Sequence, residues 1–377
     1  MGWKMGQTYD GEAMAEAIAD WVRIESPTHD VAGVNAMLDL IDRQAPAALA
    51  RERLAGREGL GDVLIFRAGP QNGQKPLLLL SHVDTVHPVG TLAKDLPLRR
   101  DGDRLYGPGI YDMKGGAFLA FAAFQTVALA QSSKRPLVYI FTPDEEIGSP
   151  ITRALIEDEG RKAEAVLVTE PARDGGKIVT ARKGVGRFDV TVEGRPAHSG
   201  TSHAKGRSAI REAAHQILTI EGMTDYARGV TTSVGMVSGG TAANTIPQWA
   251  QFCVDLRVTN LKDGQHFSDA ILGLKPKDPD LRVSVTGGMN RPPYEKNAGV
   301  VALFEKVGAL ARELGLDLQD VPMTGGGSDG NFTAALGIPT LDGLGIDGDG
   351  AHTLQEYGLV SSIAPRAGLI QRMLERL

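Results

Sequence analysis

The spacing of apolar residues predicts alternating helices and strands along the first half of the chain. Apolar positions recur at helical spacing in residues 11–24 and 33–41, and residues 115–129 form a long run of small and apolar residues. Four short apolar runs predict strands: D-V-L-I-F-R, P-L-L-L-L-S, P-L-V-Y-I-F-T and A-E-A-V-L-V-T. Strands that alternate with helices predict an α/β domain with a mixed, mostly parallel sheet.

The pattern changes near residue 180. There G-R-F-D-V-T-V-E-G alternates with period two, as expected of a strand with one face in water. Helical spacing returns in residues 208–221 and 264–274, and strand patterns follow each of these helices. Two successive strand–helix–strand units predict a small α+β domain of the ferredoxin-like, split βαβ kind.

Helices predicted at residues 300–314 and 364–377 resume the pattern of the first part. We therefore expect one domain built from two parts, residues 1–181 and 291–377, with a second domain, residues 182–290, inserted between them. A chain of 377 residues is long enough for two cores, which supports this division.

Composition narrows the class of protein. The formal net charge is −6, from 40 basic and 46 acidic residues, so no nucleic-acid partner is expected. The single cysteine, Cys253, excludes an internal disulfide, and its strand-like surroundings favour a buried apolar role over a nucleophile. Residues 1–10 lack the apolar segment of a signal peptide, and no run approaches the length of a membrane span. A cytoplasmic protein without a membrane partner is expected.

Polar residues with catalytic potential follow the predicted strands. In such α/β sheets, ligands bind beyond the carboxyl ends of the strands. L-L-L-L is followed by S-H-V-D-T-V-H-P, V-Y-I-F-T by P-D-E-E-I-G-S, and A-V-L-V-T by E-P-A. Y-D-M-K-G-G follows a glycine-rich turn at 107–109, and G-D-G-A-H-T adds a late histidine. Each motif alone is a weak signal, but their conjunction at neighbouring strand ends predicts a metal site.

The candidate ligands are two imidazoles and three carboxylates, namely His82, His352, Asp112, Glu146 and Glu170. This mixture fits zinc, cobalt or manganese better than magnesium or calcium, which prefer oxygen ligands throughout.

Two further carboxylates have roles beside the ligands. Asp84 can accept the second ring N–H of His82, and Glu145 is free to take a proton from a water molecule. His87 and His203 are interpreted as ordinary histidines.

The motifs together resemble the M20 metallopeptidases over nearly the whole chain, most closely the glutamate carboxypeptidase (carboxypeptidase G2-like) branch. They are S-H-V-D-T-V, Y-G-P-G-I-Y-D-M-K-G-G, T-P-D-E-E-I-G-S, T-E-P-A, P-A-H-S-G, N-T-I-P, N-R-P-P-Y, G-G-G-S-D-G-N-F and G-A-H-T-L-Q-E-Y. The Asp-Met-Lys sequence within the second motif also resembles the corresponding motif of acetylornithine deacetylases and succinyl-diaminopimelate desuccinylases.

The resemblance implies two divalent metal ions per chain, zinc in the first place, with cobalt or manganese as alternatives. His82 and Glu170 would bind one ion, Glu146 and His352 the other, and Asp112 would bridge them. The resemblance further implies that Asp84 orients His82, that Glu145 activates the shared water, and that the Asp112–Met113 peptide bond is cis.

The inserted domain mediates dimerisation in the family, so a homodimer is expected. His198 would reach the partner subunit's active site and stabilise the oxyanion. Asn244 and Arg291 match positions that hold the substrate's carboxylate. Three glycines, Gly325, Gly326 and Gly327, would line the pocket. Arg257 is a weaker candidate for a substrate contact and is expected mainly to support its strand.

The expected reaction is hydrolysis of the amide bond to a carboxylate-bearing amino acid, with a C-terminal glutamate-like residue as first choice. The substrate would be a small peptide or an N-acyl amino acid. An N-acyl amino acid deacylase is the first alternative. A non-catalytic peptide-binding relative would not need all the metal and base positions, and a mononuclear enzyme with one weak site is the remaining alternative.

Overall fold

The computed structural model describes residues 9–377 and divides them into two compact units. Unit 1 comprises the described residues up to Ala181 together with Lys296–Thr324 and Ser328–Leu377. Unit 2 comprises Arg182–Glu295 and, by its contacts, the short segment Gly325–Gly327. Residues 1–8, which belong to the segment expected to lack a signal peptide, lie outside the described residues.

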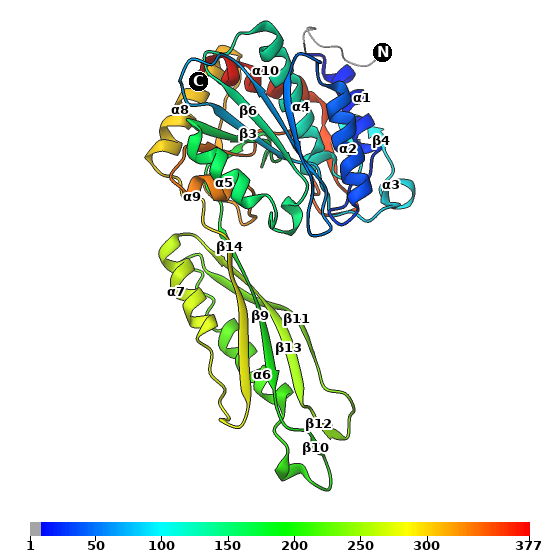
Figure 1. The fold of residues 1–377 in the computed structure, drawn as a ribbon, viewed down its shortest axis with the longest axis vertical. Helices are drawn as coiled ribbons and strands as arrows, with labels where there is room; N and C mark the ends of the chain where they lie inside the picture. Colours follow the sequence, from blue (N-terminus) through cyan, green and yellow to red (C-terminus); the bar gives the residue numbers. More distant parts are fainter. Residues whose placement is uncertain (1–8) are drawn as a thin grey trace. The chain divides into compact units, whose positions relative to one another are not determined.

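Unit 1 is organised around a mixed sheet, which within residues 9–377 has six strands in the order β1-β2-β6-β3-β7-β16 (Figure 1). The strands are β1 (Ala50–Leu54), β2 (Val63–Ala68), β3 (Leu77–His82), β6 (Leu137–Thr142), β7 (Ala165–Val168) and β16 (Thr340–Leu341). β3 pairs in parallel with both β6 and β7, and β16 pairs in parallel with β7, whereas β1 and β2 are antiparallel. This arrangement confirms the predicted mixed, mostly parallel sheet.

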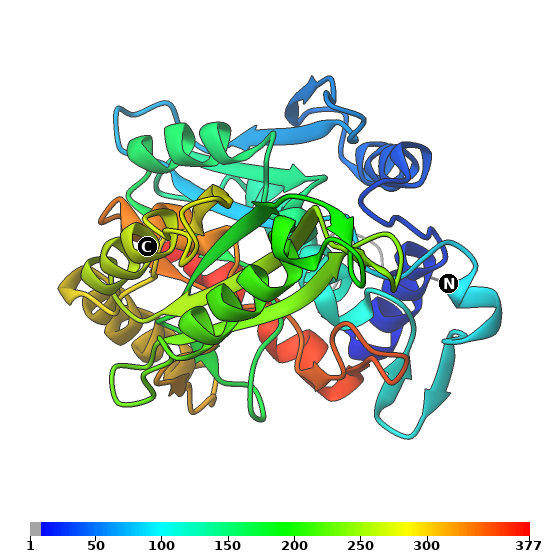
Figure 2. The same cartoon turned by 90° about the horizontal axis from the view of Figure 1, so that it is seen from below.

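Helices cover both faces of this sheet, which explains why β3 and β6 are buried along their whole length (Figures 1 and 2). Leu78 and Leu80 pack with Ile156 of α5 and Phe332 of α9 on one face. On the other face, the rings of β2 and β6 pack against Phe121 and Phe124 of α4 in tilted or edge-to-face contacts. A run of leucines therefore forms a central strand because each of its faces meets a layer of helix.

The remaining elements of unit 1 complete these layers. The helices are α1 (Gly11–Val22), α2 (Val31–Gln44), α3 (Thr91–Lys94), α4 (Gly115–Ala130), α5 (Arg153–Lys162), α8 (Ala298–Glu313), α9 (Gly330–Ala335) and α10 (Val360–Arg376), with a short helical turn η2 (Glu145–Ile147). The short strands are β4 (Arg99–Asp101), β5 (Arg104–Tyr106), β8 (Ile178–Val179), β15 (Asp320–Val321), β17 (Gly348–Asp349) and β18 (Tyr357–Leu359).

The helix α4 lies in the core of unit 1 and follows directly on a helical turn, η1 (Ile110–Lys114). Gly116 lies so close to the neighbouring chain that a Cβ there would be 2.0 Å from the carbonyl oxygen of Thr169. Together η1 and α4 span Ile110–Ala130, which is long and apolar enough to cross a membrane by length and composition. The expectation that no run approaches such a length was therefore wrong, but 78% of its most apolar window is buried in the fold, as in a core helix.

Unit 2 contains, within residues 182–295, an antiparallel sheet of four strands in the order β11-β13-β9-β14 (Figure 1). Its elements follow one another as β9 (Gly184–Glu193), α6 (Ala209–Glu221), β11 (Thr231–Gly239), β13 (Trp249–Val258), α7 (Leu261–Leu272) and β14 (Arg282–Arg291). Phe188, Val190 and Val192 form the buried face of β9, as its period-two pattern predicts. The order confirms the predicted split βαβ arrangement. A small two-stranded antiparallel sheet, β10 (Ala197–His198) with β12 (Thr245–Ile246), and the turn η3 (His203–Lys205) complete the unit.

Candidate metal centre

The order of the parallel strands brings the predicted ligands together. β3 lies between β6 and β7, so the three carboxyl ends are neighbours. His82 is the last residue of β3, Glu145 and Glu146 begin the turn η2 just after β6, and Glu170 follows β7. The central imidazole is therefore flanked by acidic residues from both neighbouring strands.

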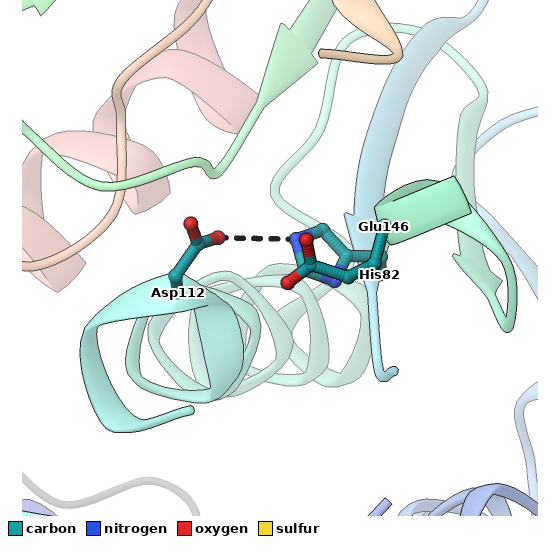
Figure 3. A group of neighbouring side chains, drawn as sticks. All are labelled: His82, Asp112 and Glu146. Carbon is teal, nitrogen blue, oxygen red and sulfur yellow. Dashed lines mark hydrogen bonds and ion pairs between the residues drawn. The ribbon is translucent and has the colours of Figure 1, made fainter. Parts of the chain in front are cut away.

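Asp112 enters the cluster from η1, the turn before α4. Its Oδ1 lies 3.2 Å from Nε2 of His82 (Figure 3). Oε1 of Glu170 lies 3.6 Å from the same nitrogen. The His82 ring is almost completely buried. The Asp112–Met113 peptide bond is cis, which confirms that expectation.

His352 approaches the other side of Asp112. Its Nε2 lies 3.5 Å from Asp112 Oδ2 and 3.2 Å from Glu146 Oε2. The two oxygens of Asp112 thus face two different histidines. The structure brings all five predicted ligands into one cluster.

Excess negative charge dominates the electrostatics of this cluster. Burial by itself would raise the pKa of Asp112, but the rings of His352 and His82 outweigh it and hold that pKa well below its usual range. Asp112 and Glu146 in turn raise the pKa of His352 to about 11. The carboxylates therefore need a positive charge between them, which protons on the rings or a cation can supply.

The side chains fit a divalent cation. Among the described residues, His82, Asp112 and Glu146 place one ligand atom each within 4.8 Å of one another, and so do His82, Glu145 and Glu170. Oε1 of Glu146 is buried and has no hydrogen-bond partner in residues 9–377, as expected of an oxygen reserved for a metal. Nitrogen and oxygen donors together match zinc and similar transition-metal ions.

The Asp84 carboxylate was expected to accept the second ring N–H of His82, but it has other partners in the structure. Nδ1 of His82 lies 2.9 Å from the main-chain oxygen of Asp84 but 3.4 Å from its carboxylate, so the main chain provides the nearer acceptor. The Asp84 carboxylate instead accepts the main-chain N–H groups of Glu145 and Glu146, each at 3.2 Å, and the hydroxyl of Thr28 at 2.7 Å. One residue thus sets both the tautomer of His82 and the position of the two glutamates.

Two functional candidates were missed in the sequence. His87, interpreted as an ordinary histidine, is buried and pairs with Glu356 through a 2.8 Å contact between Nε2 and Oε2. Glu356 also accepts main-chain N–H groups of the turn that carries Asp112. The available signal was weak: Glu356 comes four residues after His352 in the quoted G-A-H-T-L-Q-E-Y motif.

The candidate oxyanion residue His198 lies exposed at the end of β10 in unit 2. Its Nδ1 accepts the main-chain N–H groups of Gly200 and Thr201 at 3.1 and 3.2 Å. The ring proton of neutral His198 is therefore on Nε2, which leaves an N–H donor for a ligand. Asn244 is adjacent, since its main-chain oxygen accepts the N–H of Ser199 at 2.9 Å.

Arg291 is buried at the last position of β14, and Gly327 packs against it. A Cβ on Gly327 would lie 2.6 Å from Cδ of Arg291, so no larger residue fits beside this guanidinium. The carbonyl oxygen of Gly326 accepts a hydrogen bond from Arg182 at 3.2 Å. Arg257 pairs with Asp255 on its own strand, at 2.7 Å from Nε to Oδ1, in keeping with a supporting role.

The candidate substrate contacts do not form one group within a chain. Strand register puts Arg291 beside Val185, near the start of β9, whereas His198 and Asn244 lie beyond Glu193, at the other end of that strand. Ten residues of extended chain span about 30 Å. His198 and Asn244 of one chain therefore lie about the length of the unit 2 sheet from Arg291 and Gly327 of the same chain.

A cluster of imidazoles and carboxylates at the carboxyl edge of a mostly parallel sheet is typical of a metal-dependent hydrolase. The chain belongs to the peptidase family M20/M25/M40, whose sequence profile matches residues 78–376. Enzymes of this family are hydrolases that act on amide bonds and use divalent metals.

Individual relatives differ in their substrates. The chain is 30% identical to carboxypeptidase G2 from Pseudomonas sp. (strain RS-16), over 97% of this chain and 90% of the relative. It is 29% identical to a succinyl-diaminopimelate desuccinylase from Xanthomonas oryzae pv. oryzae, over 95% and 97%. Its fold resembles that of aminopeptidase PepT from Bacillus cereus, with a TM-score of 0.77 at 22% identity and 97% and 98% coverage. The family profile and the similarity to carboxypeptidase G2 confirm the predicted family, whereas the differing relatives do not fix the substrate.

Zinc added to metal-free protein is expected to raise the midpoint of thermal unfolding, because a cation relieves the repulsion among buried carboxylates. At 100 times the dissociation constant the gain is about 2.7 kcal/mol. His352→Ala should reduce the gain, and His203→Ala, which alters a histidine of unit 2, should not. A zinc response of the same size in the His352→Ala protein would contradict the ligand assignment.

Proposed function

We propose that this protein is a dinuclear amidohydrolase that removes a carboxylate-bearing amino acid, with glutamate at the carboxyl terminus as the preferred group. The observation that carries the proposal is the cluster in which the two oxygens of Asp112 face two different histidines. Similarity to carboxypeptidase G2 along 97% of the chain supports the choice of substrate.

His82 and Glu170 would hold one metal ion, Glu146 and His352 the other, and Asp112 both. When bound, two such ions polarise the scissile carbonyl and lower the pKa of a water molecule. Zinc is the preferred ion, with cobalt and manganese as alternatives.

Glu145 is proposed as the general base. Its main-chain N–H is anchored to Asp84 at 3.2 Å, and its carboxylate lies in one group with His82 and Glu170. From this position the carboxylate can take the proton of the attacking water and then deliver it to the departing amine nitrogen.

Unit 2 would supply the substrate contacts. Arg291 offers a planar guanidinium for the free carboxylate, with Gly326 and Gly327 as further residues of the proposed pocket. His198 would donate its Nε2 proton to the oxyanion, and Asn244 would add an amide to the carboxylate. Because the two pairs lie at opposite ends of one sheet, we propose that each site takes His198 and Asn244 from the partner chain of a homodimer.

An N-acyl amino acid deacylase is the second candidate. The desuccinylase from Xanthomonas oryzae pv. oryzae is similar to this chain at nearly the same identity and coverage as carboxypeptidase G2. Both candidate enzymes would hydrolyse an amide bond, and they differ in the chemical group next to that bond.

A substrate panel separates these candidates. Zinc-loaded protein should hydrolyse a dipeptide ending in glutamate with a kcat/KM at least about tenfold above those for N-acetylornithine and N-succinyl-diaminopimelate. Arg291→Ala should lower kcat/KM for the dipeptide by about 10- to 100-fold, the usual worth of a charge-assisted hydrogen bond. Arg282→Ala, at the exposed start of the same strand, is the control. Fastest hydrolysis of an N-acyl diamino acid would favour the deacylase instead.

Glu145→Gln is expected to keep both metal ions and to lower kcat by about 10²- to 10⁴-fold, because the amide cannot take up the proton. Elemental analysis measures the metal content, and Glu164→Gln, an exposed glutamate, is the control. Activity within a few-fold of the unaltered protein would remove Glu145 as the base.

A heterodimer test decides the origin of His198. A purified heterodimer of a Glu145→Gln chain with a His198→Ala chain should regain about half of the unaltered activity, because one of its two sites is intact. If both changes are placed in one chain and paired with an unaltered chain, each site loses one residue and activity should vanish. The reverse pattern of activities would show that His198 acts within its own chain.

A further inference from the structure

The carboxylate of Glu356 is completely engaged by donors. Oε2 accepts Nε2–H of His87 and the main-chain N–H of Gly109, both at 2.8 Å. Oε1 accepts the main-chain N–H groups of Tyr111 at 2.8 Å and Asp112 at 2.9 Å. Four donors from the described residues thus fill the lone-pair positions of a side chain that is only 1% exposed.

Three of these donors belong to the turn that presents Asp112 to the cluster. Gly109 has a φ of +71°, so the chain reverses there before the N–H groups of Tyr111 and Asp112 point at Glu356. The same residue, Asp112, therefore gives its N–H to Glu356 and its carboxylate to the histidines. Fixing that N–H restricts where the carboxylate can lie.

The contacts also join three ligand-carrying segments that are far apart in the chain. Glu356 follows His352 by four residues, and His87 follows His82 by five. The hydrogen bond between His87 and Glu356 connects positions 269 residues apart, and Glu356 then connects both to the turn of Asp112. One buried carboxylate thus links the segments that carry His82, Asp112 and His352.

We propose that Glu356 and His87 are positioning residues that hold the Asp112 turn in the geometry required by both metal ions. This inference rests on the proposed dinuclear function. Neither side chain is placed among the ligands, so their effect is transmitted through the main chain at Gly109, Tyr111 and Asp112. A carboxylate suits this position because it only accepts hydrogen bonds, while every group around it donates.

Glu356→Gln tests the proposal with little change in shape. The new amide group brings two N–H donors to face main-chain N–H groups, so part of the turn loses its acceptor. We expect zinc affinity, measured by competition with a chromophoric chelator, to fall by about 10- to 100-fold. In metal-free protein, amide hydrogen exchange of the segment 107–113 should become faster. Glu159→Gln is the matched control, because Glu159 is a buried, ion-paired glutamate on α5.

His87 supplies a second, independent pair of variants. His87→Gln keeps an N–H donor and should bind zinc nearly as the unaltered protein does, whereas His87→Leu fills the space without a donor and should bind more weakly. A packing role alone would make these two variants alike. If Glu356→Gln does not fold, the comparison of the two His87 variants tests the proposal in its place.

Unchanged zinc affinity and unchanged exchange in Glu356→Gln would overturn the inference, as would equal affinity of the two His87 variants. Failure of the proposed function gives a different result, in which the unaltered protein itself binds no zinc. The hydrogen exchange of residues 107–113 in metal-free protein still tests the role of Glu356 in that case.

Discussion

The concentration of buried negative charge at the ends of three parallel strands is the constraint on which the rest of the site depends. Glu146 and Glu170 from two of these strand ends, and Asp112 from the turn before α4, converge on the buried ring of His82 and the half-exposed ring of His352. Such an arrangement is stable only when positive charge or hydrogen-bond donors compensate it. The cluster therefore implies either protonated rings or bound cations, and the unpaired oxygen of Glu146 favours cations.

Compensation by hydrogen-bond donors explains why two acidic residues sit close behind the ligands. The Asp84 carboxylate is bound by the N–H groups of Glu145 and Glu146, and the Glu356 carboxylate by those of the Asp112 turn. Each buried charge is satisfied by main-chain groups of the segment that it positions. The same hydrogen bonds therefore position a ligand-carrying segment and compensate a buried carboxylate.

The dimensions of unit 2 impose a second condition on function. Its strands are long enough to keep Arg291 about 30 Å from His198 within one chain. A substrate of dipeptide size cannot touch both residues of a single chain. If both act in catalysis, the complete site needs two copies of the chain, and assembly becomes a requirement of the reaction.

The local sequence pattern predicted a helix or strand correctly where the whole element has one regular pattern of burial. The leucine run of β3, the period-two alternation of β9 and the small residues of α4 each predict their element because burial acts on every residue of it. The short exposed strands β1 and β4 carry no such pattern, since few of their side chains enter the core. The ligands were recognisable because histidines and acidic residues directly after buried strands are costly without a function.

The sequence by itself thus determined the class of fold, the inserted α+β segment and the candidates for metal binding. Only the tertiary structure decided which oxygen lies nearest to the ring nitrogen of His82 and which main-chain N–H groups the Asp84 carboxylate accepts. It also brought His87 into hydrogen-bond contact with Glu356, 269 residues further along the chain. It also decided that Asn244 and Arg291 lie at opposite ends of one sheet. The physical reason is that hydrogen bonds and strand register depend on positions in space, whereas the sequence specifies only which groups are available to make them.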